Sequence, residues 1–257
     1  GEPVAATNFG LCHESGKGRP QSYPLAAQWY RRGADGGSAF SMYNLGLAYE
    51  YGRGVTQSFE VAAGWFQRAL DANIEVSTSI DARRHLKRCR NNVDAARGIT
   101  QAQYDLAIDL MNGHSPEVRD LPRGVAMMRE AARGNLPDAW YIYASILHGG
   151  LGGVKSDLSQ AAMWTKKAAD AGHEDATLRY ADIVACGIGV KKDPVAGERI
   201  LRQAIDQGSW RAMGTLSFWY QNGDCGFRKD AAVSADWRAK ADAAQRANVK
   251  YRAQQRN

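Results

Sequence analysis

The sequence repeats itself with a period of 36 or 37 residues, and this periodicity constrains the fold more than any other feature. In the best preserved copy, one helical pattern ends at Gly52-Arg53-Gly54-Val55 and a second contains Trp65. Equivalent pairs recur at Gly16 with Trp29, Gly113 with Met127, Gly150 with Trp164, Gly187 with Ile200, and Gly223 with Trp237. A period of this length is typical of proteins built from one repeated supersecondary unit. The sequence therefore predicts six repeats, at 3–38, 39–74, 100–136, 137–173, 174–209 and 210–245.

Each repeat is predicted to be a pair of antiparallel helices. Leu45, Gly46 and Tyr49 match the helical period and so lie on one face of the first helix. The position of Gly46 holds a small residue in every repeat: Gly10, Gly46, Ala107, Ala144, Ala181 and Ser217. A small residue there allows the second helix to approach closely, and we expect the large residue at the Trp65 position to cover it. Because one hairpin cannot bury its apolar face alone, residues 1–257 are predicted to stack into a single all-α solenoid domain.

One interval departs from the period, because Gly52 and Gly113 are 61 residues apart. The insert, residues 75–99, is predicted to contain an amphipathic helix from Asp81 to Arg97. Its inward face is expected to consist of Ala82, Leu86, Cys89, Val93 and Ala96, and its other sides carry Arg83, Arg84, Lys87, Arg88 and Arg90. These charges have two interpretations: a solvated helix face, or a docking surface for an acidic patch on a protein partner.

The repeat resembles the Sel1-like repeat family, which is related to the tetratricopeptide solenoids. The resemblance rests on Leu45-Gly46-x-x-Tyr49-x-x-Gly52-x-Gly54-Val55 and Ala63-x-Trp65-x-x-x-Ala69, and on Trp164-Thr-Lys-Lys-Ala168-Ala169-x-x-Gly172. It implies a right-handed α-solenoid of about six helix-turn-helix repeats, with the basic insert helix after the second. Repeat three departs from the pattern at Met127 and in the loop 114–119, and repeat six has Cys225 in place of the second turn glycine.

The resemblance also implies a non-catalytic function in protein binding. Members of this family are often exported to the bacterial periplasm, so we expect a periplasmic location with a signal peptide removed. Exported members with a single domain include immunity proteins that neutralise type VI secretion effectors such as phospholipases, and we expect this function and a partner that is a secreted effector enzyme. The alternative is a periplasmic scaffold or signalling regulator that binds a sensor kinase or the proteins of exopolysaccharide or cell-wall assembly.

Candidate partner-binding residues lie in the first helices of repeats three to six, outside the shared core positions. In solenoids of this kind the first helices line the concave surface, where variable residues recognise partners. The candidates are Asp105, Asp109, Trp140, Arg179, Asp182, Phe218 and Trp219, together with Arg83, Arg84, Lys87 and Arg88 of the insert. An equal alternative is that Trp140 and Trp219 pack between repeats. By contrast, Trp29, Trp65, Trp164 and Trp237 occupy the core position of the repeat and are expected to be structural.

Composition and motifs argue against catalysis and against nucleic-acid binding. His13-Glu14 and His173-Glu174 lack the second histidine of a zinc-protease motif, and the five histidines fall at different repeat positions. We therefore expect no cofactor and no metal. The net charge of +6 favours acidic partners, but the basic run has no interleaved aromatic residues that would indicate nucleic acid. No run approaches the roughly 20 apolar residues that a membrane span needs, and we expect a monomer in the absence of its partner.

The four cysteines, Cys12, Cys89, Cys186 and Cys225, are not arranged as a zinc site. Adjacent repeats could bring Cys186 and Cys225 together, although three pairings of four cysteines exist and a fully reduced chain is an alternative.

The polar tail, residues 246–257, is expected either to cap the end of the solenoid or to fray.

Overall fold

The computed structural model describes residues 1–113 and 119–254, with side chains up to residue 248. Within these ranges it is all-helical, which confirms the predicted fold class. Repeat one is α1 (Glu2–Ser15) and α2 (Tyr23–Asp35), repeat two is α3 (Ala39–Tyr51) and α4 (Phe59–Asp71), and the insert forms α5 (Val76–Ala96). The later hairpins are α6 (Thr100–Asn112) with α7 (Leu121–Arg133), α8 (Pro137–Gly149) with α9 (Leu158–Asp170), and α10 (Glu174–Cys186) with α11 (Pro194–Asp206). Repeat six is α12 (Trp210–Asn222), a 3₁₀ turn η1 (Asp224–Gly226) and α13 (Ala231–Gln254).

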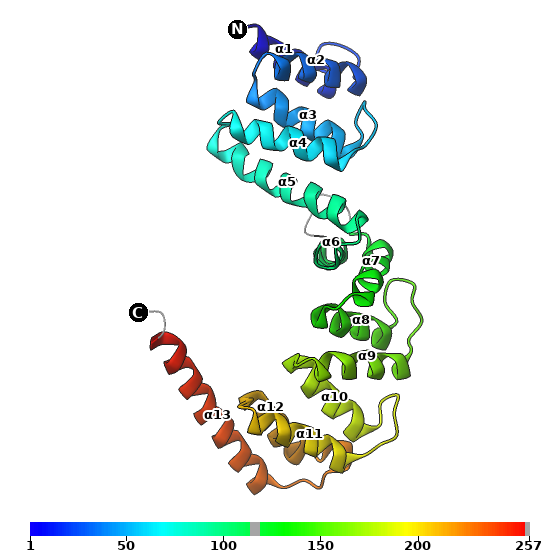
Figure 1. The fold of residues 1–257 in the computed structure, drawn as a ribbon, viewed down its shortest axis with the longest axis vertical. Coiled ribbons are helices and arrows are strands. Elements are labelled where there is room, and N and C mark those ends of the chain that lie inside the picture. The colour runs from blue at the N-terminus through cyan, green and yellow to red at the C-terminus, as the bar shows by residue number, and fades with distance from the viewer. Residues whose placement is uncertain (114–118, 255–257) are drawn as a thin grey trace. The chain divides into compact units, whose positions relative to one another are not determined.

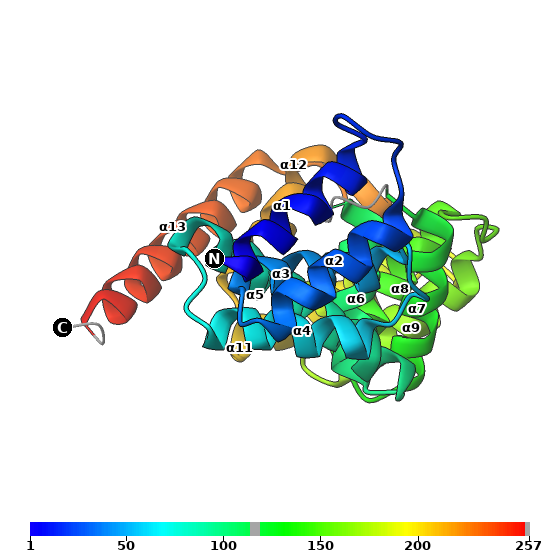
Figure 2. The same ribbon diagram turned by 90° about the horizontal axis from the view of Figure 1, so that it is seen from above.

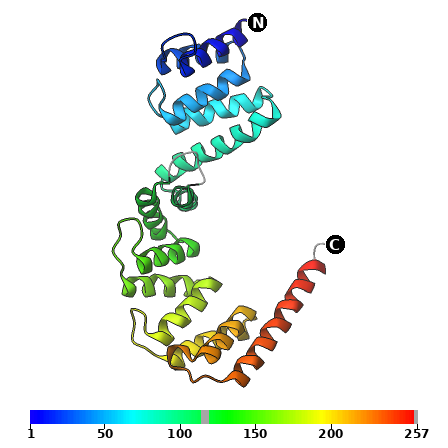
Figure 3. The same cartoon turned by 180° about the vertical axis from the view of Figure 1, so that it is seen from behind.

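The chain divides into two compact units, residues 1–106 and 107–257, with the boundary inside α6. In unit 1, α1 packs beside α2, α3 beside α4, and α4 beside α5. In unit 2, α8 packs beside α9, α10 beside α11, and α12 beside α13 (Figure 1). Seen from above, α1 to α4 overlie one another as a stack (Figure 2). Helix α13 runs on beyond α12 as a single rod (Figure 3). Thus the predicted tail, residues 246–257, is helical as far as Gln254, and the rest of it lies outside the described residues.

The second helix of each repeat begins at a side-chain cap. Ser58 is extended, and its Oγ accepts a hydrogen bond from the backbone N–H of Val61. The same cap occurs at equivalent positions in the other repeats: Ser22, Asp120, Asp157, Asp193 and Asp230. Such a cap satisfies one of the N–H groups that lack a partner in the first turn, which contributes about 1 kcal/mol per helix. The helix starts are therefore encoded locally in the sequence.

The two glycines of the turn serve different purposes. Gly52 ends α3 in the left-handed conformation, with φ of 67°. Gly54 is also left-handed, and a Cβ atom there would lie 2.2 Å from the carbonyl carbon of Tyr23, so the turn packs against the start of α2 in the preceding repeat. Gly189 meets the carbonyl oxygen of Leu158 in the same way. In repeat six this position is Cys225, which takes the same conformation with φ of 56° despite its side chain.

The residue that covers the small position of the first helix follows the tryptophan by one. A Cβ atom on Gly46 would lie 2.8 Å from the ring of Phe66, and one on Gly10 would lie 2.4 Å from Tyr30. The expectation that Trp65 covers this position is therefore wrong. One residue along a helix is a turn of about 100°, which moves the tryptophan from the hairpin interior to its edge.

Three of the four repeat tryptophans are accordingly half-buried, and only Trp65 is buried at 8% exposure. Each carries the cationic side chain that follows it by three residues over its ring: Arg32 on Trp29, Arg68 on Trp65, Lys167 on Trp164 and Lys240 on Trp237. Such contacts contribute about 0.5–1 kcal/mol at exposed sites. These tryptophans are structural, as expected, but they seal the edge of each hairpin and are not at its centre.

Candidate protein-binding surfaces

The inner face of α5 is locked to repeat two by a buried carboxylate. Glu50 of α3 is fully buried, and Arg88 donates to it from Nε at 2.6 Å and also from a terminal nitrogen. His85 Nδ1 lies 2.7 Å from the other carboxylate oxygen, and Arg88 also donates to the hydroxyl of Tyr51. Burial alone would lower the pKa of Arg88, but the bond to Tyr51 and the charge and bonds of Glu50 raise it. The guanidinium is therefore held charged where it neutralises Glu50.

The prediction that Arg88 binds a partner is wrong for this reason. Its side chain is buried because Glu50, 38 residues earlier, needs a counter-charge in the same interior site. Of the predicted inward residues, Ala82, Leu86 and Cys89 are buried, Val93 is half-buried and Ala96 is exposed. Ala95 is buried in place of Ala96. Arg83, Arg84, Lys87 and Arg90 are exposed on the other sides of the helix, as expected.

Trp140 and Trp219 pack inside the array, so the prediction that they contact a partner is wrong. Trp140 is 5% exposed, and its Nε1–H donates to the carbonyl oxygens of Ala132 and Gly134 at 3.0 Å. Trp219 is 1% exposed and donates to Asp182 Oδ1 at 2.9 Å. Both indole N–H groups thus have partners within the protein, which is the usual condition for burying tryptophan.

A groove of about 560 Å³ lies between α10, α12 and α13 in unit 2, and it includes two of the predicted residues, Asp182 and Phe218. Phe218 is 56% exposed, and its neighbour one turn earlier, Gly214, faces open space where a Cβ atom would meet nothing. The rest of the lining includes Leu178, Trp210, Arg211, Arg238 and Gln245. The groove therefore presents an exposed aromatic ring beside small, amide, basic and acidic side chains.

Asp182 is one of the residues that line this groove. It is half-buried and accepts the hydrogen bond from Trp219. Burial raises the pKa of its carboxyl group, while the bond from Trp219 and the charge of Arg179 oppose the rise. The carboxylate is thus tied to the core tryptophan as well as lining the groove, so its substitution would affect packing and surface together.

The remaining exposed or half-buried candidates of the first helices are not among the residues that line this groove. Arg179 is half-buried, with its terminal nitrogen 3.2 Å from His148 Nε2, beside a cavity of about 140 Å³ between α8, α9 and α10. Asp105 and Asp109 are half-buried on α6, where Asp105 accepts a hydrogen bond from Gln101 at 2.9 Å. Of the first-helix candidates, Asp182 and Phe218 thus line this groove, and Asp105, Asp109 and Arg179 do not.

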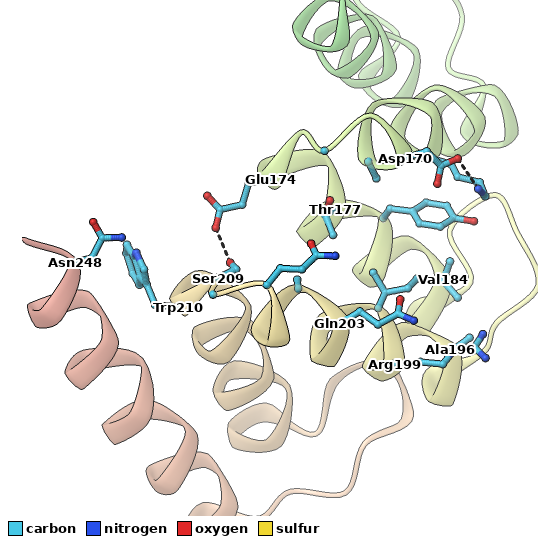
Figure 4. Close-up of a pocket in the computed structure, with 18 residues that line it drawn as sticks. Asp170, Glu174, Thr177, Val184, Ala196, Arg199, Gln203, Ser209, Trp210 and Asn248 are labelled. Atoms are coloured by element: carbon cyan, nitrogen blue, oxygen red, sulfur yellow. Dashed lines mark hydrogen bonds and ion pairs between the residues drawn. The ribbon is translucent and has the colours of Figure 1, made fainter. Parts of the chain in front are cut away.

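A second groove of about 710 Å³ lies between α9, α10 and α11, with Trp210 and Asn248 at one end (Figure 4). Its lining is mostly polar: Thr177 and Gln203 lie between the Glu174–Ser209 hydrogen bond of 2.5 Å and the Lys166–Asp170 ion pair of 2.7 Å. Sequence reasoning missed this groove because its residues are ordinary solvent-facing positions of three helices. The signal that could have pointed here is Trp210, a large aromatic residue at the first position of α12.

The structure joins Cys186, at the end of α10, to Cys225 in η1, with Cα atoms 4.2 Å apart. This bond links repeat five to repeat six. Cys89 is buried and Cys12 is half-buried, and neither of them takes part in this disulfide bond. In the part of the chain that the structure describes, no group of three or more His, Cys, Asp or Glu side chains could hold a metal ion. None of the described helices is long and apolar enough to cross a membrane.

The repeats match the model of a known family, the Sel1 repeat, at residues 3–38, 39–74, 100–136, 137–173 and 175–209. The chain belongs to the Sel1 repeat family. Sel1 repeats mediate protein–protein interaction and typically serve as non-catalytic scaffolds. The matched ranges leave out both the insert that forms α5 and the sixth hairpin, which contributes most of the groove around Phe218. No curated protein matches the sequence.

Solved structures similar to this Sel1 repeat protein include a Sel1 repeat protein from Oxalobacter formigenes, with 24% identity, coverage of 93% of this chain and 84% of that chain, and a TM-score of 0.47. Another is c5321, a protective antigen of uropathogenic Escherichia coli with an SLR fold, at 24% identity and a TM-score of 0.48. That match covers 93% of this chain and 45% of c5321. The immunity protein Pa5087 from Pseudomonas aeruginosa is 13% identical, with 95% of this chain and 82% of that chain covered and a TM-score of 0.38.

Proposed function

We propose that this Sel1 repeat protein is a non-catalytic protein of the bacterial envelope that binds and inhibits one secreted effector enzyme, as an immunity protein does. The finding that favours a binding function is the family itself, whose repeats mediate protein–protein interaction. The observation that carries the proposal on this chain is the groove around Phe218. An inhibitor of this kind needs surface complementarity and no chemistry of its own.

Phe218 has the properties of an interface anchor. It is large and 56% exposed, and it lies on a helix that is held in place by buried Leu216 and Trp219. Aromatic residues and arginine dominate binding energy at protein interfaces, and Arg211 and Arg238 line the same groove. Because Gly214 leaves the space beside the ring open, an apolar side chain of a partner could pack there.

The first test is a pull-down of envelope and secreted extracts from the source organism on the immobilised protein. Recovery of one stoichiometric secreted hydrolase, whose activity falls as the Sel1 repeat protein is added, is the expected result. Recovery of several envelope-assembly proteins or of a sensor kinase would replace the inhibitor with the scaffold alternative.

Phe218→Ala should weaken binding of that partner by about tenfold or more, because it removes a central aromatic anchor. The matched control is Met163→Ala, since Met163 of α9 is 55% exposed and outside the groove. Affinity is measured by isothermal titration calorimetry, and thermal unfolding checks that both variants remain folded. Equal affinity of wild type and Phe218→Ala would exclude this groove from the interface.

A further inference from the structure

The solvent-facing side of α5 carries a row of side chains that the fold does not use. Val76, Ile80, Arg83 and Lys87 are spaced by four, three and four residues, so they lie above one another along the helix. Arg84 lies beside this row and all five residues are exposed; we refer to them as the α5 outer face. Val76 is 77% and Ile80 is 55% exposed.

The two aliphatic residues do not stabilise the helix where they stand. Val and Ile have lower helix propensity than Ala, Leu, Lys or Glu because their branched side chains lose χ1 freedom against the preceding turn. At exposed positions they gain little burial in return. Attachment of α5 comes from its opposite side, where Leu86 and Cys89 pack on α4 and Arg88 neutralises Glu50. The exposed pair is therefore not explained by folding.

The charge of this face is positive. Arg83, Arg84 and Lys87 lie within five residues, and the nearby carboxylate of Asp81 is paired with Arg84 at 3.2 Å. Arg88 does not add to this surface charge, because Glu50 compensates it inside the protein. A partner that lies along the face thus meets two aliphatic side chains in the first turns of α5 and three cations in the next two turns.

We propose that the α5 outer face docks an acidic segment of the protein partner, with an apolar side chain of that segment seated against Val76 and Ile80. This inference rests on the proposed binding function and adds the chemistry of the partner. Aliphatic contacts supply the desolvated centre of such an interface, and complementary charge supplies orientation and association rate. The apolar part of this face consists of only two residues, which follow one another along the helix. Helices that bind at a membrane surface bury a broad apolar face, so a protein partner is favoured over a lipid.

The test uses the partner recovered by the wild-type protein and two variants of the α5 outer face. Arg83→Glu/Arg84→Glu/Lys87→Glu should weaken the complex by tenfold or more and flatten the dependence of Kd on salt. Val76→Ser/Ile80→Ser should weaken it several-fold without changing the salt dependence. The controls are Lys191→Glu/Lys192→Glu/Lys229→Glu, which reverses three exposed lysines of unit 2, and Val195→Ser, because Val195 is 79% exposed. Both controls should leave Kd unchanged.

Carbodiimide coupling of the purified complex tests directly whether the partner places a carboxylate beside the α5 outer face, because the reagent joins an amine to a carboxylate. The expected product links Lys87 to an Asp or Glu of the partner, in a segment that mass spectrometry shows to be acidic. Unchanged affinity of both α5 variants, or coupling without a product at Lys87, overturns the proposal. If Phe218→Ala weakens the complex while the α5 variants do not, the docking site fails and the proposed function stands.

A separate experiment tests whether the α5 outer face binds a lipid surface. Vesicles of phosphatidylethanolamine and phosphatidylglycerol should not sediment with the wild-type protein. Sedimentation that is lost in both Val76→Ser/Ile80→Ser and the charge-reversed variant would replace the protein partner with a membrane surface. Failure to recover any partner in the pull-down would overturn both this proposal and the proposed function.

Discussion

Side chains of the same type, only one turn apart on a helix, differ in burial in this protein. Arg84 and Arg88 are four residues apart in a basic helix, yet Arg84 is exposed and Arg88 is buried against Glu50. A buried carboxylate costs several kcal/mol to desolvate, and a bonded guanidinium offsets that cost where an exposed one does not. A similar contrast separates Phe218 from Trp219, which are adjacent in α12, because a rotation of about 100° leaves the first exposed and the second buried.

Arg88→Met should lower the free energy of unfolding by about 3–5 kcal/mol, because it removes the guanidinium that neutralises the buried carboxylate of Glu50. Urea denaturation followed by circular dichroism measures the change. Glu50→Gln/Arg88→Met should recover much of this loss, since the double variant has no buried charge. Arg84→Ala should change the free energy of unfolding by less than about 0.5 kcal/mol, as an exposed ion pair contributes little. If Arg88→Met lowers the free energy of unfolding as little as Arg84→Ala does, the buried carboxylate of Glu50 does not depend on Arg88.

At the scale of elements, the structure is a series of hairpins in which the turn of one hairpin packs against the hairpin before it. Gly54 and Gly189 approach the preceding backbone so closely that a side chain would collide with it. Repeat six departs from this rule, because Cys225 takes a left-handed conformation at the same position and is bonded to Cys186 of repeat five. The covalent bond thus replaces the close backbone contact as the link between consecutive repeats.

Cys186→Ser/Cys225→Ser should lower the stability of unit 2 by about 2–4 kcal/mol, since the bond closes a loop of 39 residues in the unfolded chain. Cys186→Ser/Cys225→Gly should be more stable than this variant by about 1 kcal/mol, because glycine adopts a positive φ without the penalty of a Cβ atom. Thermal unfolding of the two variants gives the comparison. A reversed order would mean that the left-handed conformation at residue 225 is not retained without the bond.

The whole molecule consists of two compact units, and the features that stabilise each are distinct. Unit 1 depends on the Glu50 cluster that holds α5, and unit 2 contains the disulfide and the groove around Phe218. In repeat arrays, stability is approximately a sum of repeat terms and nearest-neighbour terms. A local change should therefore affect its own unit first.

Hydrogen exchange measured by mass spectrometry tests this independence. Arg88→Met should speed exchange in α3, α4 and α5 and leave α9 to α12 unchanged. Reduction of the disulfide should speed exchange in α10, η1 and α12 and leave α1 to α4 unchanged. Faster exchange throughout the chain in either experiment would indicate that the two units unfold as one cooperative structure.

The sequence by itself determined the repeat, the hairpins and the existence of the insert helix. The caps at Ser58 and its equivalents, the turn glycines and the apolar spacing in α5 are signals that act within a few residues, so they can be read without the fold. The tertiary structure decided which side chains of those helices face the interior. Arg88 is buried because of Glu50, Trp219 because of Asp182, and Gly46 is covered by Phe66 and not Trp65. These outcomes depend on partners up to 38 residues away and on a rotation of one residue along a helix, neither of which local periodicity records.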